Sequence, residues 1–200
     1  EDRYFEPARE YTVMTTGGAV FGVSICEDIW NVDALYPTPR YNVNPIANLT
    51  ERKIQALINI SASPYSLSKE NIRHELVRNQ ALRNGIPVVY VNQVGGNDEL
   101  IFDGRSIAVN AEGQLIAAAA AFEEDLILVD LASSQGHIKV TPTDPTENVY
   151  EALVLGTRDY IEKCKFKKAV VGLSGGIDSA VVSALAVAAI GAANVVGVAM

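Results

Sequence analysis

Residues 169–179 read Ala-Val-Val-Gly-Leu-Ser-Gly-Gly-Ile-Asp-Ser, an apolar run and a glycine pair that lead into a small-residue stretch ending near Ile190. This order predicts a buried strand, a tight loop and a helix, which is the layout of a phosphate-binding loop. Gly175 and Gly176 let the backbone approach a ligand closely, and the first helical amides offer free donors at the positive end of the helix dipole. The stretch therefore predicts a doubly wound α/β unit with a nucleotide site.

The loop has no lysine after its glycines, where a Walker A loop places one, and Asp178 and Ser179 stand there instead. An acceptor and a small donor suit pyrophosphate with a bound Mg²⁺, which takes one or two carboxylates plus phosphate oxygens. The alternative is a glycine turn that binds nothing. Residues 174–179 resemble the signature of the ATP pyrophosphatases, which implies that Asp178 is a magnesium ligand. By that resemblance the ATP phosphates are lined by Gly172, Leu173, Ser174, Gly175, Gly176, Ile177, Asp178 and Ser179.

A second candidate site follows an apolar run far upstream. Residues 19–28 read Ala-Val-Phe-Gly-Val-Ser-Ile-Cys-Glu-Asp, so that Cys26 ends a predicted strand and acidic residues follow it. If Glu27 and Asp28 begin a helical turn, the free amides there favour the Cys26 thiolate and can donate to an oxyanion on an acyl substrate. The residue pattern alone leaves an inert core cysteine open as the alternative.

The stretch around Cys26 resembles the nucleophile segment of the nitrilase superfamily. Three later stretches resemble the same family in the same order, at residues 58–65, 88–94 and 95–106. A nitrilase-type amidase followed by an ATP pyrophosphatase loop resembles the glutamine-dependent NAD⁺ synthetases over nearly the whole chain. The resemblance implies an α-β-β-α sandwich, of which this chain holds the C-terminal portion, and then the start of a doubly wound α/β adenine-nucleotide hydrolase-like domain.

The resemblance also implies an activity and its residues. Cys26 is the nucleophile that strips ammonia from glutamine, and Glu27, Ser63 and Lys69 contact the glutamine. Some members have an arginine where this chain has Lys69, so a bidentate grip on a carboxylate is not expected. The ammonia then amidates nicotinic acid adenine dinucleotide, which ATP activates with release of pyrophosphate. The implied ligands are glutamine, ATP, Mg²⁺ and nicotinic acid adenine dinucleotide, and the implied assembly is a homo-oligomer.

Two further catalytic residues of the family, a glutamate and a lysine, are expected upstream of Glu1. We therefore expect these 200 residues to be the central part of a longer enzyme. The predicted division is a nitrilase-like amidohydrolase domain at 1–132, a linker at 133–144 and an ATP pyrophosphatase-type synthetase domain at 145–200. Tyr36-Pro37-Thr38-Pro39 is a candidate wall of the glutamine pocket.

Composition limits the partners. The net charge of −8 disfavours a general affinity for nucleic acid or for anionic membrane, because both need clustered Lys and Arg. No apolar run approaches the ~20 residues of a membrane span. The two cysteines, Cys26 and Cys164, rule out a disulfide framework and favour a reducing, cytoplasmic location. His74 and His137 lack zinc spacing and are expected at the surface or at helix ends.

Apolar runs bounded by turn residues predict the strands. They are expected at 19–25, 57–60, 87–92, 106–110, 114–119, 126–131, 169–173 and 195–200, with a turn at 111–113 that makes a hairpin. Ser68 is expected to cap a helix that runs to Asn84 and stops at Gly85.

The second half of the chain begins with a strong helix signal. Asp144 and Pro145 predict the start of a helix that runs to about Lys163. A further helix at 177–190 is apolar all round, so we expect it to be buried on most sides.

Two other functions compete with the implied one. Another glutamine-fed ATP pyrophosphatase amidotransferase would keep Cys26 and the loop but change the acceptor. A non-catalytic nitrilase-like scaffold would carry a degenerate nucleotide loop, against which the intact residues 26–28 and 174–179 argue.

Overall fold

The computed structural model describes residues 6, 8, 10–32 and 43–200 of the chain. Six of the strands between residues 13 and 118 form one sheet, in which three neighbouring strands are parallel to one another and the remaining pairs are antiparallel. In spatial order the strands are β1 (Val13–Thr16), β2 (Ala19–Ile25), β3 (Ala56–Ser61), β4 (Val88–Asn92), β7 (Ile107–Val109) and β8 (Leu115–Ala118).

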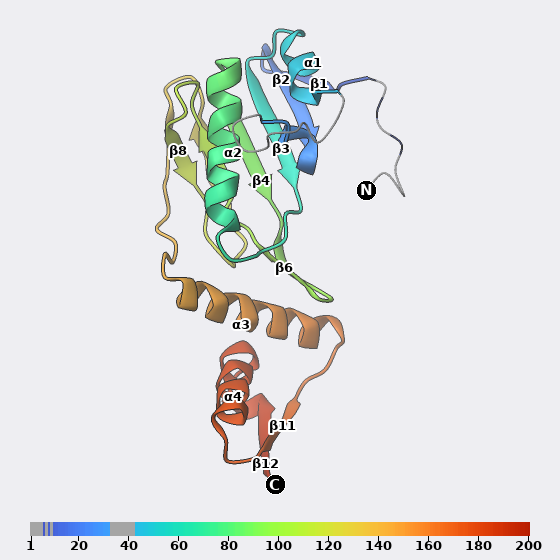
Figure 1. Cartoon of the computed structure of the whole chain (residues 1–200), viewed down its shortest axis with the longest axis vertical. Coiled ribbons are helices and arrows are strands. Elements are labelled where there is room, and N and C mark those ends of the chain that lie inside the picture. The colour runs from blue at the N-terminus through green and yellow to red at the C-terminus, as the bar shows by residue number, and fades with distance from the viewer. Residues whose placement is uncertain (1–5, 7, 9, 33–42) are drawn as a thin grey trace.

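Two helices cover one face of this sheet, α1 (Pro45–Thr50) and α2 (Lys69–Asn84) (Figure 1). The main core lies between them and the sheet, where Leu57, Leu76 and Val88 are fully buried. On the opposite face of the sheet, Ile25 is 68% exposed, Ile60 53% and Val91 43%. A sheet with both faces apolar is typical of a layer packed on each side, as in the predicted sandwich.

Shorter strand pairs extend from the large sheet. β5 (Val94–Asn97) and β6 (Leu100–Asp103) form a hairpin, and β9 (Val129–Asp130) pairs with β10 (Gln135–Gly136). Cys26–Ile29 and Ala192–Asn194 form short 3₁₀ helices.

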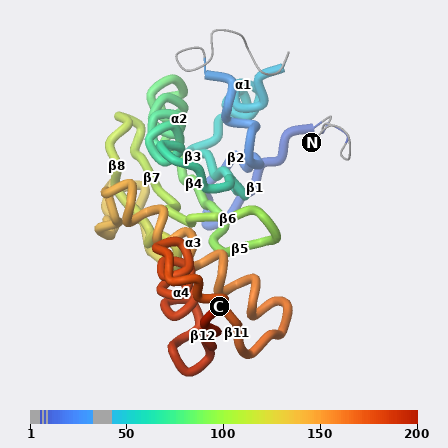
Figure 2. The backbone as a smooth tube through the Cα atoms, turned by 60° about the horizontal axis from the view of Figure 1, so that its bottom comes forward, coloured from blue at the N-terminus to red at the C-terminus, as the bar shows by residue number. Residues whose placement is uncertain are grey.

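The long helix α3 (Pro145–Lys163) lies across the end of the sheet unit, and α4 (Ile177–Ile190) packs on its other side (Figures 1 and 2). Ala152 and Leu155 of α3 pack with Phe122 and with the hairpin residues Val94 and Ile101. The parallel pair β11 (Ala169–Leu173) and β12 (Val195–Ala199) flanks α4. The predicted parallel start of an α/β unit is therefore confirmed.

Most predicted elements are confirmed, with three corrections. The strand expected at 126–131 is reduced to Val129–Asp130, because Leu126 and Leu128 project into solvent, 90% and 86% exposed. Ser68 precedes α2 but takes a left-handed conformation and makes no capping hydrogen bond with its side chain. The helix α4 is buried only along one side, where it packs mainly against α3, β11 and β12; its buried residues are Ala186 and Ala189.

Candidate functional site

The carboxyl ends of the parallel strands β2, β3 and β4 bring the first set of predicted residues together. Cys26 and Glu27 follow β2 directly, Ser63 follows β3 by two residues, and Lys69 opens the helix α2 that comes next. Lys69 lies close enough to Cys26 and Glu27 for their charges to influence its pKa. Residues that are up to 43 positions apart in the sequence, from 26 to 69, thus meet at one sheet edge.

The backbone at Cys26 is strained in a way that aims its side chain. Cys26 has φ +46°, a left-handed value that a non-glycine residue adopts at a cost of roughly 1 kcal/mol or more. Asn59, fully buried on β3, holds the turn by donating to the Cys26 carbonyl oxygen at 3.3 Å and to Ser24 Oγ at 3.0 Å. The amide of Ile25 donates to Asp28 Oδ2 at 2.7 Å. These contacts fix the start of the predicted helical turn at 26–29.

The pKa of the Cys26 thiol is raised, so this thiol stays protonated to a higher pH than an exposed one. Burial raises its pKa, and the charge of Glu27 acts in the same direction. Backbone amides of Ala62 and Glu27 donate to the sulfur and lower the pKa, as does Lys69. The amide of Glu27, in the predicted helical turn, therefore favours the thiolate as expected, although burial is the larger contribution and leaves the pKa raised.

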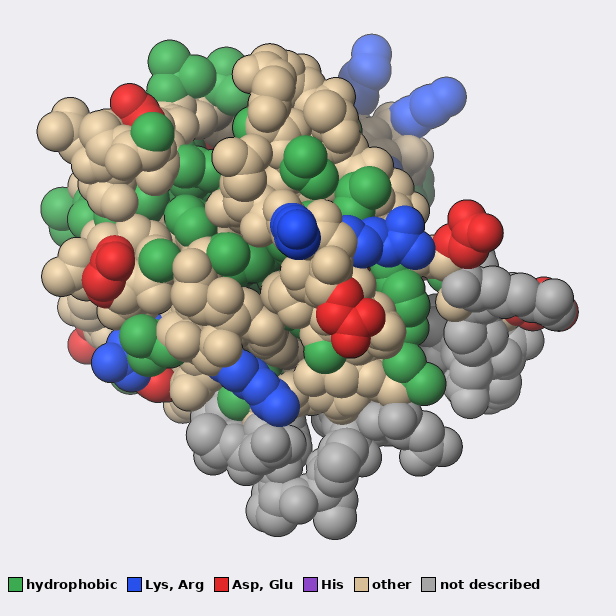
Figure 3. Space-filling view, turned by 90° about the horizontal axis from the view of Figure 1, so that it is seen from above, with side chains coloured by type: hydrophobic (Ala, Val, Ile, Leu, Met, Phe, Trp, Pro, Cys, Tyr) green, Lys and Arg blue, Asp and Glu red, His purple; other side chains and the backbone are tan. Residues whose placement is uncertain are grey.

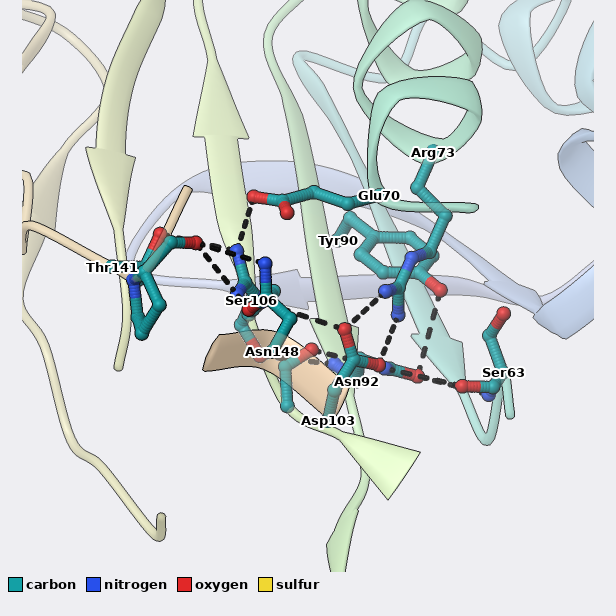
Figure 4. Close-up of polar contacts among 12 residues, drawn as sticks. Ser63, Glu70, Arg73, Tyr90, Asn92, Asp103, Ser106, Thr141 and Asn148 are labelled. Atoms are coloured by element: carbon teal, nitrogen blue, oxygen red, sulfur yellow. Dashed lines mark hydrogen bonds and ion pairs between the residues drawn. The ribbon is translucent and has the colours of Figure 1, made fainter. Parts of the chain in front are cut away.

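Ser63 is buried and rigidly held at its backbone. Its amide donates to Asn92 Oδ1 at 2.9 Å, while Asn92 Nδ2 donates to the carbonyl oxygens of Ser63 at 3.4 Å and Gly104 at 2.9 Å (Figure 4). The Ser63 hydroxyl has no hydrogen-bond partner among the described residues, although it is buried. A buried hydroxyl without a partner costs free energy, so this oxygen is available for a polar ligand.

Lys69 sits half-buried at the first position of α2, with Nζ 6.0 Å from the centre of the Trp30 ring. Burial lowers its pKa, and the neighbouring Arg73 charge lowers it further. A single ammonium in this position supplies a point charge rather than a fork of donors, so it cannot grip a carboxylate in a bidentate manner.

The surrounding polar residues were not predicted. Asn59 and Asn92 interrupt apolar strands at inward positions, and this interruption is the one signal that the sequence offered for them. The ion pair of Arg73 with Asp103 and the contacts of Arg105 join residues about 30 to 40 positions apart, which no local pattern reveals.

His74 departs from its predicted surface position. It is half-buried and lines a cavity of about 150 Å³ with Glu70 and Arg105, and burial is the main reason for its lowered pKa. His137 is exposed, as predicted.

The predicted nucleotide loop lies on the far side of α3 from the sheet (Figure 1). It connects the end of β11 to the first turn of α4, and Gly175 at its centre has φ +80°, which requires glycine. Ser179 Oγ donates to the Gly176 carbonyl oxygen at 3.0 Å and lies 3.3 Å from Ser174 Oγ. The loop and Asp178 are exposed, so a phosphate can reach the helix amides.

No cluster of three or more potential metal ligands exists among the described residues. Asp178 is exposed at the helix start, where a single carboxylate suits a metal that completes its shell with phosphate oxygens and water. Both cysteines are free, as predicted.

The segment 36–39, predicted to line the glutamine pocket, lies outside the described residues.

In the described part of the chain, no helix has the length and apolar character to cross a membrane. On the face seen in Figure 3, the described acidic and basic side chains are interspersed among apolar ones, unlike a continuous basic surface for nucleic acid.

Comparison with known proteins gives two family matches on one chain. Residues 1–137 match the carbon-nitrogen hydrolase family and residues 149–200 match NAD synthase. A glutamine-dependent NAD(+) synthetase from Synechocystis sp. is 45% identical over 205 residues, an alignment that covers 100% of this chain and 37% of the relative. The chain thus spans little more than a third of that protein.

Similar solved structures agree with these family matches. The glutamine-dependent NAD+ synthetase from Acinetobacter baumannii, solved in complex with ADP, is similar with a TM-score of 0.86 and 36% identity; the match covers 100% of this chain and 36% of that one. A synthetase from Cytophaga hutchinsonii matches with a TM-score of 0.70 and 24% identity over 94% of this chain and 31% of that one, which supports the fold alone. The mixed α/β architecture predicted from the sequence is confirmed.

Proposed function

The chain belongs to the carbon-nitrogen hydrolase family, and from this premise we propose that the protein uses ammonia from glutamine to amidate nicotinic acid adenine dinucleotide to NAD⁺, at the expense of ATP. The observation that carries the proposal is the succession of a carbon-nitrogen hydrolase match at 1–137 and an NAD synthase match at 149–200 in one chain. Each match contains a side-chain set suited to one half of the reaction. We keep 1–132, 133–144 and 145–200 as the proposed division of the chain.

At the first site Cys26 Sγ attacks the side-chain carboxamide carbon of glutamine. The carbon–nitrogen bond breaks, ammonia leaves and a glutamyl thioester remains, which water hydrolyses to glutamate and the free thiol. Because burial raises the Cys26 pKa, a base must take the thiol proton at neutral pH. By resemblance that base is a glutamate that these 200 residues do not supply.

Three residues bind the glutamine in this proposal. Glu27 pairs with the substrate's amino group, and the Lys69 ammonium pairs with its carboxylate. The Ser63 hydroxyl accepts or donates one hydrogen bond, supported by its burial without a protein partner. Since all three groups are held on strand ends or a helix start, substrate binding requires little reorganisation.

At the second site the residues of the 172–179 loop bind the ATP phosphates through backbone amides and the hydroxyls of Ser174 and Ser179. Asp178 would hold Mg²⁺, which neutralises phosphate charge when bound. The substrate carboxylate attacks the α-phosphorus of ATP, pyrophosphate leaves, and ammonia then displaces AMP to give the carboxamide. A homo-oligomer and a cytoplasmic location complete the proposal.

The test separates the two sites in the full-length protein. We expect Cys26→Ala to abolish glutamine-dependent NAD⁺ formation and to leave ammonia-dependent formation near the parental rate, with Cys164→Ala as the matched control that changes neither. Asp178→Ala is expected to remove synthesis from both nitrogen sources while glutamine hydrolysis persists. Loss of both routes in a folded Cys26→Ala protein contradicts the two-site scheme. Pyrophosphate release triggered by another carboxylate, but not by nicotinic acid adenine dinucleotide, would identify a different amidotransferase.

A further inference from the structure

A buried arginine joins the first turn of α2 to the start of α3. Arg105 lies in the loop between β6 and β7, 5% exposed, with φ +55° and its backbone amide donating to the Ala120 carbonyl oxygen at 3.1 Å. The ring of Phe122 packs against its guanidinium, 5.6 Å away. The position of this side chain is therefore fixed on all sides by the sheet unit.

The guanidinium reaches three groups of the segment that enters α3. Nη1 donates to Thr141 Oγ1 and Nη2 to the Pro142 carbonyl oxygen, each at 3.1 Å, and Nη2 also donates to Asn148 Oδ1 (Figure 4). Asn148 is itself tied to this segment, since its Nδ2 donates to the Pro142 carbonyl oxygen at 3.2 Å. Asn148 lies in the first turn of α3, so Arg105 holds the start of that helix.

On its other side Arg105 forms an ion pair with Glu70, the second residue of α2, through the same Nη1 atom (Figure 4). Arg73, one turn along, makes a bidentate ion pair with Asp103, whose carboxylate lies 3.6 Å from Arg105 Nε. The α2 start has no side-chain cap at Ser68. These two ion pairs therefore anchor the first turn of α2 to the loop that follows β6.

Lys69 is the first residue of this turn and directly follows the uncapped Ser68. Its ammonium must stay beside Trp30 and face Cys26 if it is to bind the substrate carboxylate. A shift of α2 at Glu70 would carry Lys69 with it, because neighbouring residues in one helical turn move together.

We propose that Arg105 is a positioning residue for glutamine binding. Through its ion pair with Glu70 it fixes the position of Lys69, and through its contacts with the start of α3 it makes the position of Lys69 depend on the position of that helix. This inference rests on the proposed function and adds to it the residue that joins the amidase pocket to the helix leading to the nucleotide loop. A ligand that shifts α3 shifts the contacts of Asn148 and Thr141 with Arg105, and through them the affinity for glutamine.

The test compares three variants of the full-length protein. Arg105→Lys keeps the charge but cannot reach Glu70 and Asn148 together, and we expect it to raise the KM for glutamine about ten-fold or more, the lower end of the value of one lost charge-assisted hydrogen bond. Asn148→Ala, which touches no proposed substrate group, is expected to raise this KM about two- to five-fold. Arg78→Lys is the control, on the same helix as Glu70, with its side chain 51% exposed and paired with Glu75 at 3.6 Å, and leaves the KM unchanged.

The ammonia-dependent rate supplies the second readout. A raised glutamine KM with an unchanged KM for ammonia supports the positioning role, whereas an equal loss on both routes means that Arg105 serves stability alone and overturns it. An unchanged glutamine KM in both Arg105→Lys and Asn148→Ala also overturns it. If Arg105→Lys does not fold, Asn148→Ala decides alone. Absence of glutamine-dependent synthesis in the parent protein would instead refute the proposed function.

Discussion

The region around Cys26 and the loop at 172–179 are held in place in opposite ways. Around Cys26 the polar groups are buried and held by partners from distant strands, such as Asn59 and Asn92. The nucleotide loop is exposed, and within the described chain the side-chain hydrogen bonds of Ser174 and Ser179 join residues no more than five positions apart. One region is organised by tertiary contacts and the other by local backbone geometry.

This difference indicates how sensitive each region is to a single substitution. Removing one partner of a buried pair leaves the other uncompensated, so the first region has a high sensitivity to single substitutions. In the loop the side chains face water. A substitution there costs free energy through backbone strain or through a lost contact with a ligand. The three predictions below test this contrast.

The largest effect is expected at the Arg73–Asp103 pair. Both residues are almost fully buried, at 3% and 0% exposed, so Arg73→Met leaves the Asp103 carboxylate without its main partner. We expect the free energy of unfolding to fall by about 3 to 5 kcal/mol, measured by urea denaturation of the full-length protein.

Two controls sharpen this prediction. Exchange of both residues for apolar ones, Arg73→Met with Asp103→Leu, should recover much of the loss because no buried charge remains. Asp178→Asn in the exposed loop should change stability by no more than about 0.5 kcal/mol. If Arg73→Met and Asp178→Asn destabilise equally, the contrast between the two regions is wrong.

A smaller effect is expected where the hairpin β5–β6 meets α3. A Cβ at Gly96 would lie 3.0 Å from the Gly156 Cα, and the Gly96 amide donates to Asp159 Oδ2 at 2.7 Å. Gly96→Ala must therefore displace backbone, and we expect it to cost about 1 to 3 kcal/mol in urea unfolding.

Gly175 in the nucleotide loop gives the comparison for Gly96. A Cβ there meets nothing within 4 Å, and only its φ of +80° is unfavourable, so Gly175→Ala should cost about 1 kcal/mol. A larger loss for Gly175→Ala than for Gly96→Ala would show that packing at α3 is looser than the distances imply.

The same contrast explains which parts of the fold could be predicted from the sequence. Runs such as 19–25 and 87–92 identify β2 and β4 because apolar, β-branched residues between turn residues are typical of buried strands. Asp144 and Pro145 mark the start of α3 because capping is local, and Asp144 Oδ1 accepts from the amides of Thr146 at 2.7 Å and Glu147 at 3.0 Å. The loop at 172–179 was located for the same reason.

Features that depend on distant partners could not be predicted. The run 126–131 has the composition of a strand, but pairing is confined to Val129–Asp130, and composition does not report whether a partner strand is beside it. The hairpin β5–β6 is rich in glycine, which conceals its strand character, and the contacts of Arg105 with α3 span 36 to 43 residues. Cys26 itself was singled out from the sequence, but Asn59, which holds its turn, and Asn92, which holds Ser63, were not.

The smallest effect concerns the pKa of Cys26, which tests how the buried region balances opposing contributions. Burial raises this pKa, Glu27 raises it further, and Lys69 lowers it. Glu27→Gln should therefore lower the pKa of the thiol and increase its thiolate fraction at neutral pH, whereas Lys69→Met should raise the pKa and decrease that fraction. The pH dependence of iodoacetamide alkylation, followed by mass spectrometry of the Cys26 peptide, measures both shifts. Shifts of the same sign in the two variants would mean that changes in burial, the largest contribution, dominate over the neighbouring charges.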